Sequence, residues 1–250
     1  MDMACVARRA GTGVSVVIIV AFAASLGSAL MNAQAPVAAK TVWDAPPMYT
    51  EEQASRGSQV FGSTCANCHT LGSEGNRPLS GDKFIGRYTQ RTVGDLYGFM
   101  QKNMPNGNGG TLSANTYSDL LALILKSNGL PAGATELTPT AVAAVQIQPK
   151  DGPGLLPAGT LVRVVGCLAK PGADFVLTTA TAWERTDKTG TTPADATRAL
   201  GEQTVALKFL MTKLDAQIGK RMSVTGLLVG AGGADGINVS TVTRVAETCP

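Results

Sequence analysis

The spacing of hydrophobic residues changes from a helical to a strand period near the middle of the chain. From residue 49 to residue 129, hydrophobic positions recur at steps of three and four, as on one face of a helix. From residue 160 onward, hydrophobic and polar residues alternate in short runs, as on the two faces of a strand. The sequence therefore predicts an α+β protein of two domains, an all-α domain followed by a small all-β domain.

Three short helices are predicted in the first domain. The first starts at Thr50, whose hydroxyl can cap the helix, and Gln53 completes a capping box. The second starts near Thr92. The third starts after Ser113 and ends at Gly129, a residue type that is common at helix C-termini.

Short alternating runs separated by turn residues mark the second domain. These runs are residues 161–165, 175–177, 205–207, 222–225 and 237–239, with a helical turn over residues 214–218. About five strands with one late helical turn fit an OB-like barrel, and a β-sandwich fits almost as well. The predicted boundaries are 42–133 for the helical domain, 134–157 for a linker rich in proline, alanine, glycine and threonine, and 158–250 for the β-rich domain.

The N-terminus has the features of an export signal. Arg8 and Arg9 precede a hydrophobic run over residues 14–31, and small residues at cleavage spacing end at Ala35. We expect cleavage after Ala35, which makes residues 1–35 a signal peptide and the mature protein periplasmic. The run is also long enough to stay as an uncleaved anchor, so we expect membrane contact only if it is retained.

Composition and cysteine count narrow the classes of function. A formal net charge of +3 over 250 residues is too close to neutral for a nucleic-acid-binding protein. Cys5 lies in the signal segment, and two further cysteines belong to one short motif. We expect the remaining pair, Cys167 and Cys249, to form a disulfide in an oxidising compartment. Two unrelated buried thiols are the alternative.

That short motif, Cys65-Ala66-Asn67-Cys68-His69, has the form C-x-x-C-H and contains the only histidine of the chain. Two thiols at this spacing can bond to the vinyl groups of a haem, and the adjacent histidine can bind its iron. We therefore expect one covalently bound haem c. Half of a zinc site and a thioredoxin-like redox pair are weaker interpretations, because the chain near the motif offers neither further ligands nor a preceding strand.

A low-spin electron-transfer haem needs a second axial ligand, and no other histidine is present to supply it. Met104 is followed by Pro105, which stops the helix and lets the methionine side chain leave the hydrophobic stripe. Met100 lies on the same stripe, however, so a position in the core explains the spacing of Met104 equally well.

Residues 42–137 resemble a class I monohaem c-type cytochrome, similar to the cytochrome modules associated with bacterial quinoprotein dehydrogenases. The matching segments are residues 49–54, 56–57, 65–69, 79–81, 104–105, 112–113, 117 and 128–133. The resemblance implies that Met104 is the distal iron ligand. It also implies that the carbonyl of Pro78 accepts a hydrogen bond from the ring N–H of His69, which orients the proximal ligand.

The resemblance also implies a function and a helix packing. It predicts an electron carrier and not an enzyme, taking electrons from a dehydrogenase and passing them to another cytochrome or a terminal oxidase. A haem-based sensor with a displaceable Met104, and a structural cytochrome subunit of a membrane redox complex, are the alternatives. The first and third helices are expected to cross, with Gly57 and Phe61 packing against Tyr117 and Leu121. The resemblance does not extend to the β-rich domain.

Overall fold

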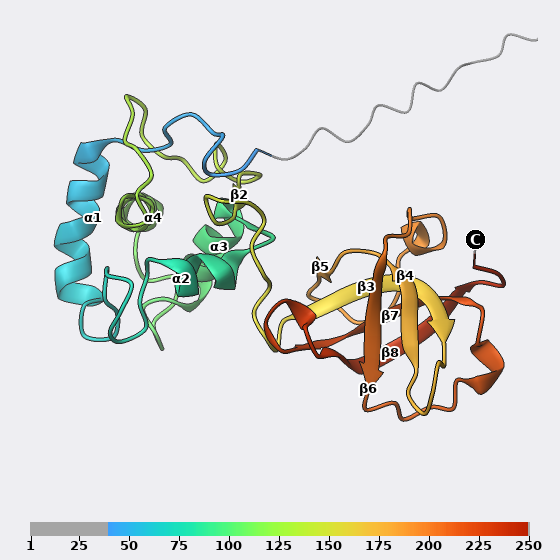
Figure 1. The fold of residues 1–250 in the computed structure, drawn as a ribbon. Coiled ribbons are helices and arrows are strands. Elements are labelled where there is room, and N and C mark those ends of the chain that lie inside the picture. The colour runs from blue at the N-terminus through green and yellow to red at the C-terminus, as the bar shows by residue number, and fades with distance from the viewer. Residues whose placement is uncertain (1–39, 250) are drawn as a thin grey trace, which may run out of the picture. The chain divides into compact units, whose positions relative to one another are not determined.

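The computed structural model describes residues 40–249, so the expected signal peptide and Cys5 lie outside the described residues. A helical part is followed by a part that is mostly sheet, as the hydrophobic periodicity predicts (Figure 1). Each part contains its own cluster of buried hydrophobic side chains. Within residues 40–249, none of the helices has both the length and the hydrophobicity that crossing a membrane requires.

The helical part begins its main helices where the sequence predicts. Its elements are α1 (Glu51–Thr64), α2 (Asp82–Tyr88), α3 (Val93–Asn103) and α4 (Ala114–Ser127). The hydroxyls of Thr50, Thr92 and Ser113 accept backbone N–H groups at the starts of α1, α3 and α4. Helix α2 was not predicted. It follows Gly81 and has no side-chain cap, so the usual start signal is missing.

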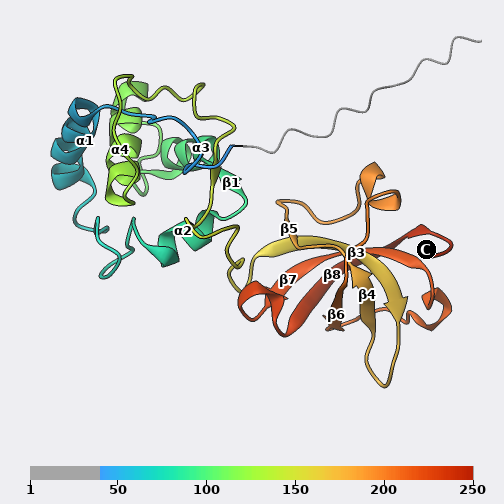
Figure 2. The same cartoon turned by 45° about the horizontal axis from the view of Figure 1, so that its top comes forward.

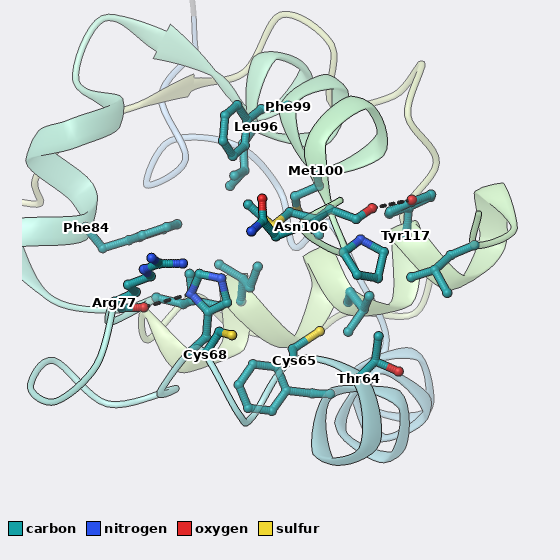
Figure 3. Close-up of a pocket in the computed structure, with 18 of the residues that line it drawn as sticks. Thr64, Cys65, Cys68, Arg77, Phe84, Leu96, Phe99, Met100, Asn106 and Tyr117 are labelled. Atoms are coloured by element: carbon teal, nitrogen blue, oxygen red, sulfur yellow. Dashed lines mark hydrogen bonds between the residues drawn. The ribbon is translucent and has the colours of Figure 1, made fainter. Parts of the chain in front are cut away.

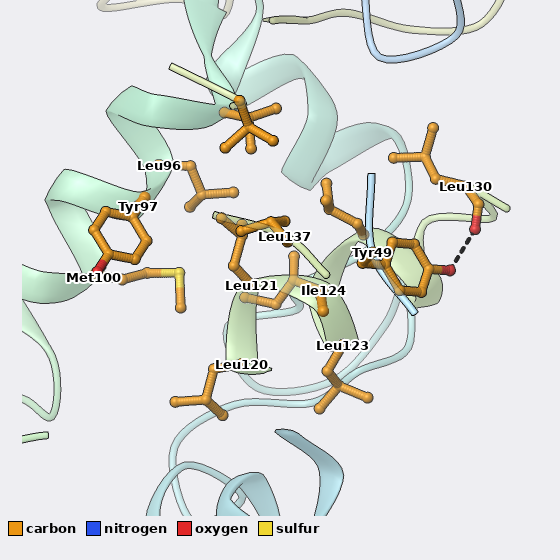
Figure 4. Close-up of a cluster of buried hydrophobic side chains, with 14 of the residues drawn as sticks. Tyr49, Leu96, Tyr97, Met100, Leu120, Leu121, Leu123, Ile124, Leu130 and Leu137 are labelled. Carbon is orange, nitrogen blue, oxygen red and sulfur yellow. Dashed lines mark hydrogen bonds between the residues drawn. The ribbon is translucent and has the colours of Figure 1, made fainter. Parts of the chain in front are cut away.

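Helices α1 and α4 cross in close contact at Gly57. A Cβ atom on Gly57 would lie 2.1 Å from the carbonyl oxygen of Asp119 and 3.1 Å from the backbone nitrogen of Leu120. The expected crossing is therefore present, and the backbone that Gly57 meets is that of Asp119 and Leu120. Helix α4 is buried along most of its length, and its leucines form the centre of the core shown in Figure 4. At the edge of that core the Tyr49 hydroxyl donates to the Leu130 carbonyl at 2.6 Å.

The segment expected as a linker contributes to this helical core. Leu137, Val142 and Ile147 are buried within it, which the polar and small-residue composition of the segment did not predict. The side-chain amide of Gln53 exchanges two hydrogen bonds with the backbone of Leu137, at 2.7 and 3.1 Å. The Gln53 side chain therefore points toward Leu137 and does not complete the expected capping box. The short strands β1 (Arg91–Thr92) and β2 (Gln146–Ile147) pair antiparallel.

The second part forms one curved sheet, which Figure 2 shows with its top turned toward the viewer. Its strands are β3 (Leu161–Ala169), β4 (Val176–Ala180), β5 (Glu184–Arg185), β6 (Gln203–Lys208), β7 (Arg221–Val229) and β8 (Gly236–Ala246). The strand order is β4-β6-β8-β7-β3-β5, and β4 also pairs with β3. The pairings from β3 through β4, β6, β8 and β7 therefore return to β3. Strands β6 and β8 pair parallel, and the other pairs are antiparallel.

A disulfide joins Cys167 of β3 to Cys249, as the cysteine count predicts. The two Cα atoms lie 5.7 Å apart, within the usual range for this bond. The predicted helical turn between β6 and β7 is present as a single 3-10 turn over Asp215–Gln217. The disulfide closes a loop of 82 residues and attaches Cys249 to strand β3.

Candidate haem site

The C-x-x-C-H motif folds as a tight turn at the end of α1. The N–H of Cys65 still bonds to the carbonyl of Phe61, at 2.9 Å, and so closes the helix. The N–H groups of Cys68 and His69 then both bond to the Cys65 carbonyl at 3.0 Å. Neither thiol is in a disulfide, Cys65 is half-buried and Cys68 is exposed. The local fold therefore leaves both sulfur atoms free to react.

His69 is held in one orientation by the loop that follows it. Its Nδ1 lies 2.9 Å from the carbonyl oxygen of Arg77. A carbonyl can only accept, so Nδ1 carries the proton and Nε2 keeps a lone pair for a metal. The loop itself is fixed by the backbone bonds of Thr70, to Asn76 at 3.0 Å and from Leu79 at 2.9 Å.

The expected partner of His69 was wrong by one residue. The carbonyl that contacts Nδ1 belongs to Arg77 and not to Pro78. Pro78 follows directly, and proline restricts the backbone of the residue before it. Every residue carries a carbonyl, so no side-chain pattern could have identified Arg77 as the acceptor.

Met104 leaves the helix that precedes it. It is the residue that ends α3, its N–H bonds to the Met100 carbonyl at 2.9 Å, and its own backbone is extended. Met100 stays within the helix and is buried. This change of backbone conformation supports the expectation that Pro105 ends the helix and lets Met104 leave the helical stripe that contains Met100. Both methionines nevertheless line the same cavity.

One cavity brings together Cys65, Cys68 and His69, which follow the end of α1, with Met104, which follows the end of α3 (Figure 3). Pro78 does not line this cavity. The cavity encloses about 820 Å³ of empty space, a figure that includes open solvent at its mouth. The lining residues are Phe61, Thr64, Cys65, Cys68, His69, Arg77, Leu79, Phe84, Tyr88, Leu96, Phe99, Met100, Met104, Pro105, Asn106, Leu112, Tyr117, Leu120 and Ile124. Thiols, an imidazole and a thioether within mainly apolar walls fit a haem.

Helix α2 supplies part of this wall, and the sequence analysis missed it. Phe84 and Tyr88 lie one turn apart, with ring centroids 5.1 Å from each other, and both line the cavity. Their spacing of four residues is a helical signal, but it covers too short a segment to stand out.

Burial, together with the neighbouring Cys68, raises the pKa of the Cys65 thiol. The Cys65 thiol therefore stays protonated in the apoprotein at neutral pH.

Within the described part of the chain, no group of three or more histidine, cysteine, aspartate or glutamate side chains is arranged to hold a metal ion. The candidate iron ligands that the sequence indicates, His69 and Met104, instead line the mainly apolar cavity next to the C-x-x-C-H motif.

Comparison with known proteins gives one family match. Residues 52–124 match the family model described as cytochrome C oxidase, cbb3-type, subunit III. No curated protein and no solved structure shows significant similarity to the chain. The match supports a c-type cytochrome domain in the helical part, and such a domain implies haem c, electron transfer with redox partners and an exported location.

Proposed function

We propose that the helical part binds one haem c covalently and that the protein carries single electrons without transforming a substrate. The observation that carries the proposal is that Cys65, Cys68, His69 and Met104 line one mainly apolar cavity. When bound, haem c would supply a one-electron ferric–ferrous couple. The mainly apolar walls would limit contact of the haem with water, and this favours electron transfer with little solvent rearrangement.

Each of these residues has a defined role in the proposal. Cys65 and Cys68 form the covalent attachment, and His69 binds iron through Nε2 while the Arg77 carbonyl orients its ring. Met104 would supply the second protein ligand to the iron. With His69 and Met104 both bound, the iron would have no open site for oxygen or peroxide, and this favours a carrier over a sensor or an enzyme.

The domain organisation is part of the proposal. We place the cytochrome domain at residues 42–133, a connecting segment at 134–157 and the β-rich domain at 158–250. The closed sequence of strand pairings through β3, β4, β6, β8 and β7, with β6 and β8 parallel, supports an OB-like barrel. The absence of a second large sheet among residues 40–249 speaks against the sandwich.

Location and partners follow from the N-terminal sequence and the family match. Residues 1–35 have the composition of an export signal, and this supports a periplasmic protein. The electron donor would be a dehydrogenase and the acceptor another cytochrome or a terminal oxidase. The family description names an oxidase subunit, so a cytochrome subunit of a membrane redox complex is the second candidate. Contacts with soluble partners would be small and transient.

Two methionines on one cavity make a matched test of the ligand set. In the ferric protein, Met104→Leu should abolish the methionine–iron charge-transfer band, whereas Met100→Leu should retain it. Covalent attachment should be lost in the Cys65→Ser, Cys68→Ser double variant, as a haem stain of the denatured protein would show. A band that survives in Met104→Leu would contradict Met104 as the ligand, and ready binding of carbon monoxide to the reduced wild type would contradict the electron-carrier assignment.

A further inference from the structure

The loop after Met104 is attached to α4 through a single side chain. Tyr117 lies in the first turn of α4 and is 1 % exposed. Its hydroxyl donates to the Met104 carbonyl at 2.6 Å (Figure 3). The same hydroxyl accepts the N–H of Gly110 at 3.1 Å. One oxygen atom thus joins both ends of the segment from Met104 to Gly110.

The other contacts of this segment are local. Asn108 donates its N–H to the Pro105 carbonyl at 2.7 Å, and Thr111 donates its hydroxyl to the Asn108 carbonyl at 2.7 Å. Gly109 lies against the end of α3, because a Cβ there would be 2.1 Å from the Lys102 carbonyl oxygen. These contacts shape the loop or hold it against α3, the helix from which it emerges. Among the described residues, the hydrogen bonds between this segment and α4 are the two made by Tyr117.

We propose that Tyr117 is a positioning residue for Met104, closing the loop so that the thioether stays at the iron. The inference rests on the proposed function, since it takes Met104 as the second axial ligand. The tyrosine acts on the main chain of Met104 and not on its sulfur. Its place at the start of α4 makes the position of the methionine depend on the most buried helix of the domain.

Loss of the hydroxyl has a defined physical consequence. In Tyr117→Phe the ring still fills its place in the core, but the Met104 carbonyl and the Gly110 N–H lose their common partner. The closed loop then lacks the two hydrogen bonds that stabilise it in the wild type, so the loop opens more often. The apparent binding free energy of an external ligand that competes with Met104 for the iron becomes more favourable by the amount of stabilisation that the closed loop loses.

Tyr97 provides a matched control. It is also buried, its ring packs edge-on to that of Tyr117 with centroids 6.4 Å apart, and it does not line the cavity. Its hydroxyl makes a long 3.4 Å contact with the Ala114 carbonyl and none with the methionine loop. Tyr97→Phe therefore removes the same atom from the same core without touching the loop.

The test is a titration of the ferric holoprotein with imidazole, followed by the shift of the haem absorption bands in every variant, for wild type, Tyr117→Phe, Tyr97→Phe and Met104→Ala. We expect about a tenfold rise in apparent imidazole affinity in Tyr117→Phe, from the loss of the two hydrogen bonds. Tyr97→Phe should stay within about twofold of the wild type. Hydrogen exchange of the Gly110 amide, measured in the reduced protein, should accelerate in Tyr117→Phe alone.

The outcomes separate this inference from the proposed function. If Met104→Ala raises imidazole affinity but Tyr117→Phe behaves like Tyr97→Phe, Tyr117 is not a positioning residue and the ligand assignment stands. If Met104→Ala leaves imidazole affinity unchanged, Met104 is not the ligand and both proposals fail. A faster Gly110 exchange together with unchanged imidazole affinity would mean that the hydroxyl closes the loop without holding the methionine, and this too overturns the inference.

Discussion

Asp195 is a fully buried carboxylate in the sheet part of the protein. It accepts hydrogen bonds from the Ser223 hydroxyl at 2.7 Å and from the N–H and hydroxyl of Thr192 at 3.0 and 2.7 Å. Arg163, itself 6 % exposed, lies with its Nε 3.6 Å from the carboxylate. Burial by itself raises the pKa of Asp195, but these hydrogen bonds and the arginine lower it by more, so the net direction is downward.

This carboxylate predicts how the stability of the sheet part depends on pH. A folded pKa below the ordinary value of about 3.9 means that the ionised group stabilises the fold above that value, and that the contribution is lost as pH falls through the folded pKa. In Asp195→Asn the free energy of unfolding should fall by about 2 kcal/mol at pH 7, because the hydrogen bonds to the buried carboxylate lose their charge and Arg163 keeps only Glu184, 3.5 Å away, as an acidic partner. Urea denaturation followed by circular dichroism at several pH values measures both effects.

The difference in the free energy of unfolding between wild type and Asp195→Asn should become smaller as the pH drops below about 4. Asp174→Asn, a change at an exposed carboxylate, is the control and should match the wild type at every pH. A gap that stays constant down to pH 2 would mean that the ionisation of Asp195 does not stabilise the fold.

At the scale of elements, the crossing of α1 and α4 depends on the absence of one side chain. Gly57→Ala would place a methyl group 2.1 Å from the Asp119 carbonyl oxygen, so the helices must separate. We expect the free energy of unfolding to fall by about 2 kcal/mol or more. Gly62→Ala, on the same helix and with no atom within 4 Å of the new Cβ, should instead stabilise by up to about 1 kcal/mol. Equal effects of the two changes in urea denaturation would contradict this packing.

The elements that the sequence predicted well are those whose signals are local. The helices starting after Thr50, Thr92 and Ser113 each have a capping hydroxyl, and the main strands each have a run of alternating residues. Helix α2 has no capping side chain and is short, so it was missed. Leu137 was assigned to a linker because its burial depends on Gln53, far away in the sequence.

At the scale of the whole molecule, the two hydrophobic cores consist of separate sets of residues. The disulfide between Cys167 and Cys249 lies in the sheet part and spans 82 residues of sequence. Such a cross-link restricts the unfolded chain and stabilises by about 2–4 kcal/mol. The Cys167→Ser, Cys249→Ser double variant should therefore lower the free energy of unfolding of the sheet part by about that amount. The methionine–iron band of the helical part should stay unchanged in this variant, and its loss would show that the two cores depend on each other.

The sequence by itself indicated the chemistry, because the residues proposed to attach the haem and to bind its iron lie within five consecutive positions, 65–69. It also determined the helix starts, the strands and the disulfide pair, which depend on neighbouring residues or on a count of cysteines. The tertiary structure decided which carbonyl orients His69, how the hydroxyl of Tyr117 joins the ends of the methionine loop, and how β4 closes the pairings back to β3. These are contacts between groups distant in sequence or between backbone atoms that all residues share, so only folding selects them.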